Sequence, residues 1–183
     1  QTWGMFSSRA APDYWRPYFD LLDETAAAGG RMYAQVHSRA LSSLLSFESN
    51  TPFDTWDVWR DIRALPLAEQ VAKLHDPDLK AKLVEVASQE YKGPRIVGAE
   101  PRPPSWDYVY AMDDMVYDKP SIGEIARQKG VNPVELMIDL ALEHDLKLFF
   151  RQPLANENMD QVIEMIKHPR SVVTFSDSGA HVS

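Results

Sequence analysis

LKLFFRQPLANENMDQVIEMIKHPRSVVTFSD, residues 146–177, carries the clearest structural pattern in this chain. It starts with the apolar run LKLFFRQP and ends with a second, unalternating apolar run, SVVTFSD. Between them, Asn158 and Gln161 suit the start of a helix that Pro169 ends. A strand, a helix of about ten residues and a second buried strand are typical of a right-handed βαβ unit with parallel strands. The stretch therefore predicts a parallel α/β fold.

Upstream, residues 13–28 predict a helix, and a pair of glycines, Gly29 and Gly30, ends it. Residues 32–37 follow as a short run of apolar and β-prone side chains, which indicates a buried strand. This helix followed by a strand fits the same parallel α/β pattern.

The middle of the chain is mostly helical in pattern. Residues 38–105 include three amphipathic helical segments followed by a proline-rich stretch, and we interpret this region as an inserted helical excursion rather than a second domain. Residues 106–112 are compatible with a short strand. Two better-marked helices come next: Ser121 has the spacing of a capping box, and Asn132 precedes a first-turn proline.

Composition narrows the class of protein. The 183 residues are 44% hydrophobic and 25% charged, as expected for one water-soluble globular domain. The net charge of -8 argues against a nucleic-acid partner, and without an apolar run of about 18 residues we expect no membrane partner. The chain has no cysteine, which excludes disulfides and thiolate metal sites within these residues and is compatible with a cytoplasmic location. A metal bound here would need His, Asp or Glu ligands.

Polar side chains follow three of the predicted strands. Asp177 follows the last apolar run, His37 ends the strand at residues 32–37, and Arg151 or Gln152 follows Phe150. In parallel α/β folds the carboxyl ends of the strands carry the chemistry. A carboxylate at the end of a buried strand is costly unless a cation compensates its charge, so a bound divalent metal is one explanation for Asp177.

A simpler explanation exists for each of these residues. An aspartate after a strand often caps the next helix or forms a turn, so Asp177 need not bind a metal. His37 can be a strand-end histidine bonded to the backbone, and His181 can be an exposed loop residue or a substrate contact.

One segment resembles a known family. MIKHPRSVVTFSDSGAH, residues 165–181, resembles the last barrel strand of the amidohydrolase superfamily, in particular its D-aminoacylase (N-acyl-D-amino-acid deacylase) branch. Three other segments resemble that branch in the same order: GGRMYAQVHSRALSSLLSFES, LPLAEQVAKLHDPDLKAKL and SIGEIARQKGVNPVELMIDLALE. The resemblance covers most of the chain.

The resemblance implies a (β/α)8 TIM-type barrel with one or two divalent metal ions, usually zinc. Such enzymes hydrolyse an amide C–N bond through a metal-bound hydroxide, and the implied small-molecule substrate is an N-acylated D-amino acid. Asp177 matches the aspartate that ends the eighth strand, binds the metal or its water, and passes a proton to the leaving amine. His37 would end the sixth strand as a metal ligand. Substrate-binding roles are expected for Arg39, Arg151 and His181, since a guanidinium can hold a carboxylate bidentately.

The chain also departs from the family pattern. It has no His-x-His pair, and it has no counterpart of the fourth-strand bridging ligand or the fifth-strand histidine. A barrel needs about 250 residues. We therefore expect residues 1–183 to be the later part of one barrel domain, about strands six to eight, with residues 38–105 as an insertion or lid.

Such a part should be inactive by itself, and it should associate with the missing barrel portion or with copies of itself. Two alternatives stay open. The same metal chemistry would serve a cyclic amidase or a deaminase, and the chain could instead be a non-catalytic α/β binding or assembly module.

Overall fold

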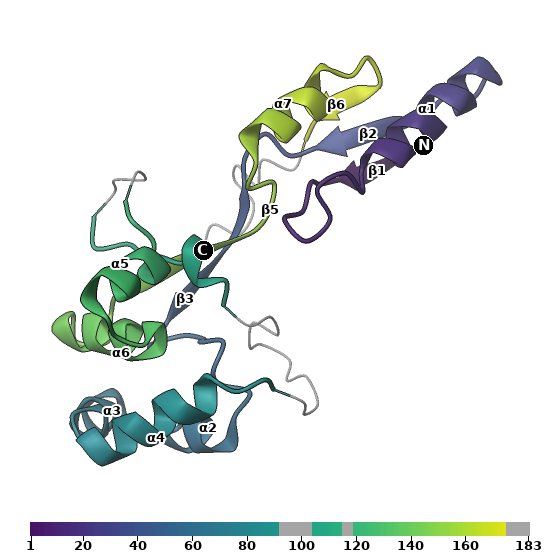
Figure 1. Cartoon of the computed structure of the whole chain (residues 1–183). Helices are drawn as coiled ribbons and strands as arrows, with labels where there is room; N and C mark the ends of the chain where they lie inside the picture. Colours follow the sequence, from purple (N-terminus) through teal and green to yellow (C-terminus); the bar gives the residue numbers. More distant parts are fainter. Residues whose placement is uncertain (92–103, 115–118, 175–183) are drawn as a thin grey trace. The chain divides into compact units, whose positions relative to one another are not determined.

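The computed structural model describes residues 1–91, 104–114 and 119–174 (Figure 1). The chain is a mixed α/β protein that divides into two compact units. Unit 1 comprises Gln1–Ser43 and Pro153–Ser183, and unit 2 comprises Leu44–Gln152. Within the described ranges, no helix is both long and apolar enough to cross a membrane.

The described residues of unit 1 form a three-stranded parallel sheet with two helices. Its strands lie in the order β1 (Thr2–Met5), β2 (Tyr33–Val36) and β6 (Ser171–Val173). The register pairs Met5 with Val36 and Val36 with Val173, so the three strands end level with one another. The helices are α1 (Arg16–Ala27) and α7 (Met159–Lys167).

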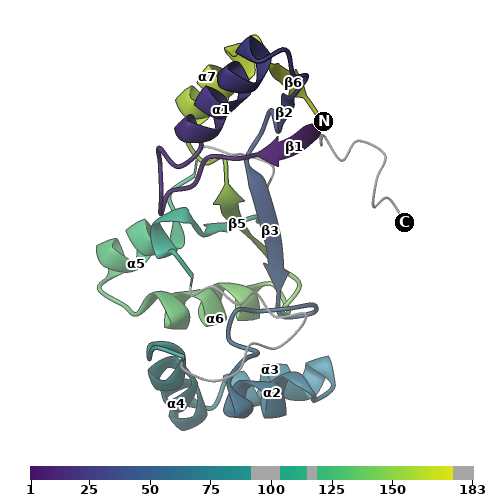
Figure 2. The ribbon, with the colours of Figure 1, turned by 90° about the vertical axis from the view of Figure 1, so that its right-hand side faces the viewer.

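Both helices of unit 1 pack on the same face of its sheet, and they lie side by side in Figure 2. The alternation of side chains along a strand explains the arrangement: Ala34 and Val36 are buried beneath the helices, whereas Tyr33 is exposed. The buried cluster consists of Met5, Trp15, Phe19, Leu22, Ala34, Val36, Val162 and Met165. Neither α1 nor α7, the helices described in this unit, covers the opposite face, where Val172 is also exposed.

The described residues of unit 2 form a second small sheet and five α-helices. The sheet has the order β3 (Leu41–Ser46), β5 (Phe149–Ala155) and β4 (Tyr110–Ala111), and β4 pairs antiparallel with β5. Along the chain, β3 and β5 run through the two boundaries between the units. The helices are α2 (Asp57–Arg63), α3 (Leu67–Leu74), α4 (Pro77–Ala87), α5 (Ile122–Lys129) and α6 (Pro133–Glu143), with a 3-10 turn, η1 (Trp106–Tyr108).

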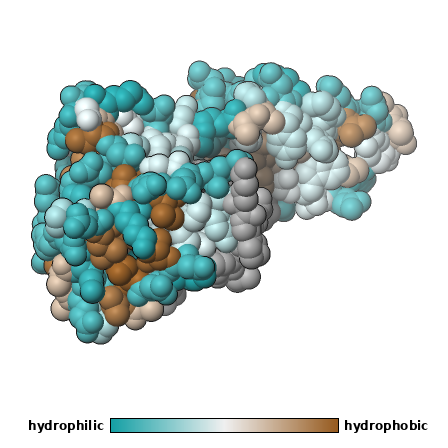
Figure 3. Space-filling model, turned by 60° about the horizontal axis from the view of Figure 1, so that its bottom comes forward, coloured by the Kyte–Doolittle hydropathy of each residue, from teal (hydrophilic) through white to brown (hydrophobic). Residues whose placement is uncertain are grey.

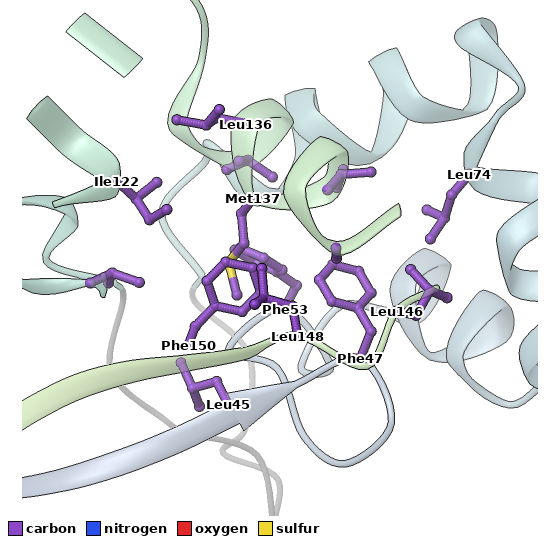
Figure 4. Packing of buried hydrophobic residues seen from close by; sticks show 14 of the residues in the cluster. Leu45, Phe47, Phe53, Leu74, Ile122, Leu136, Met137, Leu146, Leu148 and Phe150 are labelled. Atoms are coloured by element: carbon purple, nitrogen blue, oxygen red, sulfur yellow. The ribbon is translucent and has the colours of Figure 1, made fainter. Parts of the chain in front are cut away.

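The helices and the sheet of unit 2 enclose a hydrophobic core (Figure 4). Phe47, Met137 and Phe150 are fully buried in it. Trp59 lies in the same core, where its indole Nε1 donates a hydrogen bond to the Leu83 carbonyl at 3.1 Å. Because a buried indole N–H needs a partner, this bond lets a large aromatic side chain enter the core without an unsatisfied polar group.

Three helix starts predicted from local sequence, at Ser121, Asn132 and Asn158, are confirmed, whereas the helix predicted from residue 13 begins at Arg16. Ser121 Oγ accepts from the Glu124 amide at 3.1 Å, and the Glu124 carboxylate accepts from the Ser121 amide at 2.7 Å, which completes the capping box of α5. Gly130 ends that helix with φ of 69°, in the left-handed region that glycine adopts at little cost. Asn132 and Asn158 cap α6 and α7 through their side chains.

The predicted βαβ unit is wrong. β5 and β6 belong to different sheets: β5 pairs antiparallel with β4, and β6 pairs in parallel with β2. An apolar run has no feature that specifies its partner or its direction, so two such runs around a helix can enter separate sheets.

The sequence analysis also missed β1 and β3. The first is only four residues long and includes a glycine, and the second was assigned to the helical excursion at residues 38–105. In the structure, the part of the chain inserted into unit 1 runs from Leu44 to Gln152, so that α5 and α6 belong to unit 2.

Candidate functional site

The carboxyl end of the unit 1 sheet is the candidate site, because its parallel strands end level there. The first residues beyond the three strands are Phe6, His37 and Thr174. The Thr174 amide donates to the Val36 carbonyl at 3.1 Å, so the pairing of β6 with β2 continues past the last strand residue. The rings of Phe6 and His37 lie 6.0 Å apart, and His37 is only 2% exposed. A buried histidine thus stands at the sheet end where ligands bind in such folds.

Asn156 connects the loops that follow β1 and β2. It is fully buried, and its Oδ1 accepts from the Ser7 amide at 2.8 Å and from Ser7 Oγ at 3.4 Å. Its Nδ2 lies 3.4 Å from the His37 carbonyl and 3.5 Å from the Arg39 carbonyl, and donates to both. Its own amide donates to the Ser7 carbonyl at 3.0 Å. One side chain therefore holds two strand ends together.

An ion pair reinforces the first of these connections. Arg9 Nη1 lies 2.9 Å from Glu157 Oε1, and the Glu157 side chain is only 6% exposed. Glu157 directly follows Asn156, so the loop after β1 is bound to the segment before α7 by a charged contact as well as by the amide. Burial of the carboxylate reduces screening by solvent, which strengthens this contact relative to a surface pair.

The two arginines predicted to bind substrate lie in different settings. Arg39 is exposed in the loop after β2, and its Nη1 contacts the Ala40 carbonyl at 3.4 Å. Arg151 lies inside β5, paired in register with Tyr110, and its guanidinium lies 4.7 Å from the centre of the Tyr110 ring. The prediction that Arg151 or Gln152 ends a parallel strand is wrong, because β5 continues to Ala155 in an antiparallel sheet.

The strand number predicted for His37 also changes. Neighbouring strands of a (β/α)8 barrel follow one another in number. Since β2 pairs directly with β6, a barrel in which β6 is the eighth strand makes β2 the seventh and β1 the sixth. The end of β1 carries Phe6 and Ser7 rather than a histidine. The metal role of His37 stays a prediction.

The donor set for a metal is incomplete in the part of the chain that the structure describes. Asp177 and His181 lie outside the described residues. Inside them, no group of three or more His, Cys, Asp or Glu side chains is arranged to hold a metal ion. A catalytic zinc needs three protein ligands, so the described residues do not form a zinc site by themselves.

Unit 2 has a surface groove of about 840 Å³ between α4 and α6. Its floor is apolar, with Leu74 and Leu136, and Lys80 crosses it to pair with Asp139. On the face shown in Figure 3, hydrophobic residues gather among hydrophilic ones. Of the site residues predicted from the sequence, the described ones, His37, Arg39 and Arg151, are not among the residues that line this groove.

Sequence reasoning missed Ser7, Asn156 and Glu157. The only local signal was an asparagine just before a helix cap, and asparagine is one of the few residues that adopt the left-handed conformation observed at position 156, where φ is 58°. Comparisons with protein-family models, with curated proteins and with solved structures found no match for this chain. Support for a function therefore comes from the residues and from this geometry.

Proposed function

We propose that this chain is the later part of a metal-dependent amidohydrolase barrel that hydrolyses a linear amide, with N-acylated D-amino acids as the substrate class. The observation that carries the proposal is the sheet of unit 1. Its strands are parallel, its two helices lie on one face, and its polar residues gather at the carboxyl end. Purely parallel sheets are normally covered on both faces. A segment of a barrel wall has this form, with helices outside and the opposite face toward the barrel interior.

The same observation argues against a self-contained α/β binding module. Such a module would cover both faces of its sheet, and it would leave only short edges unpaired. In the described part of unit 1, β1 and β6 are both edge strands, and Tyr33 and Val172 are exposed on the uncovered face. A barrel segment accounts for these features, since further strands would pair with each edge.

Asp177 has the central chemical role in the proposal. Its carboxylate would accept a proton from the attacking water and transfer it to the nitrogen of the leaving amine, because an amine leaves as a neutral group. Thr174 lies level with His37, so the chain reaches this end of the sheet three residues before Asp177. His37 would contact substrate from the end of β2, and Arg39 in the following loop would bind the substrate carboxylate.

A divalent metal would be held by Asp177 together with further ligands, because the described residues contain no group of three His, Cys, Asp or Glu side chains that could hold it. Zinc in such an enzyme polarises the scissile carbonyl and activates water. His37 alone cannot hold it, since three protein ligands are needed. The 183-residue chain by itself should therefore bind no stoichiometric zinc and should release no amine from N-acetyl-D-methionine.

The direct test uses the complete protein that contains this chain. Asp177→Asn should lower the rate of amine release from N-acetyl-D-methionine by roughly 10²–10⁴-fold, the usual effect of removing an essential acid-base group. Asp20→Asn is the matched control, because Asp20 is exposed on α1, and it should retain full activity. Near-normal turnover by Asp177→Asn would contradict the role of Asp177. Tight zinc binding and turnover in the isolated chain would contradict the incomplete barrel.

A further inference from the structure

Asn156 uses every hydrogen-bonding function of its side chain at the candidate site. The orientation of its amide follows from its partners: the Ser7 amide can only donate, and the His37 and Arg39 carbonyls can only accept. Oδ1 must therefore face the loop after β1, and Nδ2 must face the loop after β2. A side chain that is only a donor or only an acceptor cannot make both contacts.

The backbone at this position restricts the residue further. Asn156 has φ of 58°, a left-handed conformation in which most side chains are strained and which asparagine and glycine tolerate. Glycine would fit the backbone but would lose the amide. Asparagine is thus the residue that satisfies both the backbone conformation and the two loops.

The position of Asn156 in the chain extends its reach to the third strand. Two residues later, Asn158 caps α7 by accepting from the amides of Asp160 and Gln161 at 3.0 and 3.3 Å. Helix α7 then leads into β6, whose continuation contains Asp177. The segment that carries Asn156 is therefore bound directly to the ends of β1 and β2 and leads along the chain to the end of β6.

We infer that Asn156 is a positioning residue, which fixes His37 at the carboxyl end of the sheet through its main-chain carbonyl while holding the loop after β1 in place. The catalytic purpose of this positioning rests on the function proposed above. The positioning itself does not, and it can be measured on the chain without any substrate.

Two substitutions distinguish the contact of the Asn156 side chain with the loop after β1 from its contact with the loop after β2. Asn156→Asp keeps an acceptor for the Ser7 amide but places a carboxylate oxygen against the His37 and Arg39 carbonyls, so only the connection to β2 is lost. Asn156→Gly keeps the backbone conformation and the main-chain bond to the Ser7 carbonyl, and it removes the side-chain bonds to both loops. Asn158→Asp is the matched control: it makes the same chemical change two residues away, at a cap where aspartate serves as well as asparagine.

Nuclear magnetic resonance of the chain with isotope-labelled histidine provides the readout, with His37→Gln used to assign the His37 ring signals. In Asn156→Asp and Asn156→Gly those signals should move by more than their line widths. The His75 and His144 rings, which lie in unit 2, should not change. Asn158→Asp should leave all of them in place. Because buried groups lose partners, Tm should fall by about 2–10 °C in Asn156→Asp.

Unchanged His37 signals in Asn156→Asp would overturn the inference. A second measurement needs no variant: the Ser7 amide of the unsubstituted chain should exchange its hydrogen slowly, since it is bonded to a buried acceptor. Exchange of that amide at the rate of an exposed loop would also overturn the inference, even if the variants fail to fold.

An activity measurement on the complete protein distinguishes the two proposals. Asn156→Asp should lower kcat/KM for N-acetyl-D-methionine by roughly 10–100-fold, as for other groups that orient a reactive residue, and Asn158→Asp should not. If the unsubstituted protein releases no amine while the His37 signals shift as expected, the proposed function fails and the positioning role of Asn156 holds. If amine is released and the signals stay in place, the positioning role fails alone.

Discussion

Unit 1 and unit 2 bury their hydrophobic side chains in different ways. In unit 2 the helices α2 to α6 and the strands β3 and β5 all contribute to one enclosed core. In the described part of unit 1, α1 and α7 cover one face of the sheet. The hydrophobic effect grows with the apolar area removed from water, so unit 2 has the larger intrinsic source of stability.

The residues with candidate chemistry lie in the unit with the smaller core. Ser7, His37 and Asn156 are all buried polar residues of unit 1, and hydrogen bonds and the Arg9–Glu157 ion pair connect their segments. Contacts of this kind specify geometry more than they stabilise a fold. We therefore expect unit 1 to be less stable than unit 2 when each unfolds by itself.

The largest expected effect is in the core of unit 2. Trp59→Ala should lower the free energy of unfolding by about 3–5 kcal/mol, because it leaves a large cavity and removes the donor to the Leu83 carbonyl. Hydrogen exchange should become roughly 10²–10⁴-fold faster in α2 to α6. Trp56→Ala is the control, since Trp56 is only half-buried, and its effect should be clearly smaller.

If Trp59→Ala accelerates exchange in β1 and β2 as strongly as in α2 to α6, the two units unfold together. Unit 1 and unit 2 would then not differ in stability as separately unfolding units. Protection that falls only in unit 2 would show that the two units unfold separately.

A smaller effect is expected from the core of unit 1. Leu22→Ala should lower the free energy of unfolding by about 2–5 kcal/mol, because Leu22 on α1 is fully buried against the sheet. Its neighbour on the same helix, Leu21, is 49% exposed, so Leu21→Ala should change stability by less than about 0.5 kcal/mol. Urea denaturation with hydrogen exchange would measure both. Equal effects of the two substitutions would show that α1 does not pack on the sheet in solution.

Features that depend on neighbouring residues were predictable from the sequence in both units. Helix ends are local: Ser121, Asn132 and Asn158 bond to amides two or three residues away, so their roles follow from spacing. The three helical segments of the excursion were likewise confirmed, because an amphipathic pattern is a property of one segment. The helices of both units were found in this way.

Strand pairing and the candidate site depend on distant residues. Ser7 and Asn156 are 149 positions apart, and His37 and Asn156 are 119 apart. Nothing in the segment before α7 indicates which loops its asparagine joins. For the same reason the sequence indicated strands at residues 146–153 and 106–112, but not that they pair antiparallel as β5 and β4. The choice of partner is made by the packed units, where each strand must bury a face.

The smallest expected effect is a pH dependence in unit 1. Arg16 on α1 holds Glu164 on α7, with Arg16 Nη2 donating to Glu164 Oε2 at 2.8 Å, and this hydrogen bond lowers the pKa of the Glu164 carboxyl below its usual value. Because the pKa is lower in the folded chain than in the unfolded chain, the pair stabilises unit 1 above the unfolded pKa of about 4.3. The contribution is lost as pH falls through the folded pKa.

Glu164→Gln removes the carboxylate and should therefore reduce this part of the acid dependence. The change should be small and should shrink in high salt, because both side chains are exposed and solvent screens them. Thermal melts between neutral and acidic pH would measure the difference in stability between the variant and the unsubstituted chain. Hydrogen exchange of the amides in α1 and α7 would show that the difference lies in unit 1. The expected sign is a smaller loss of stability on acidification in the variant than in the unsubstituted chain. A larger loss in the variant would mean that the carboxylate does not stabilise the contact between α1 and α7, and that hydrophobic packing alone holds these helices on the sheet.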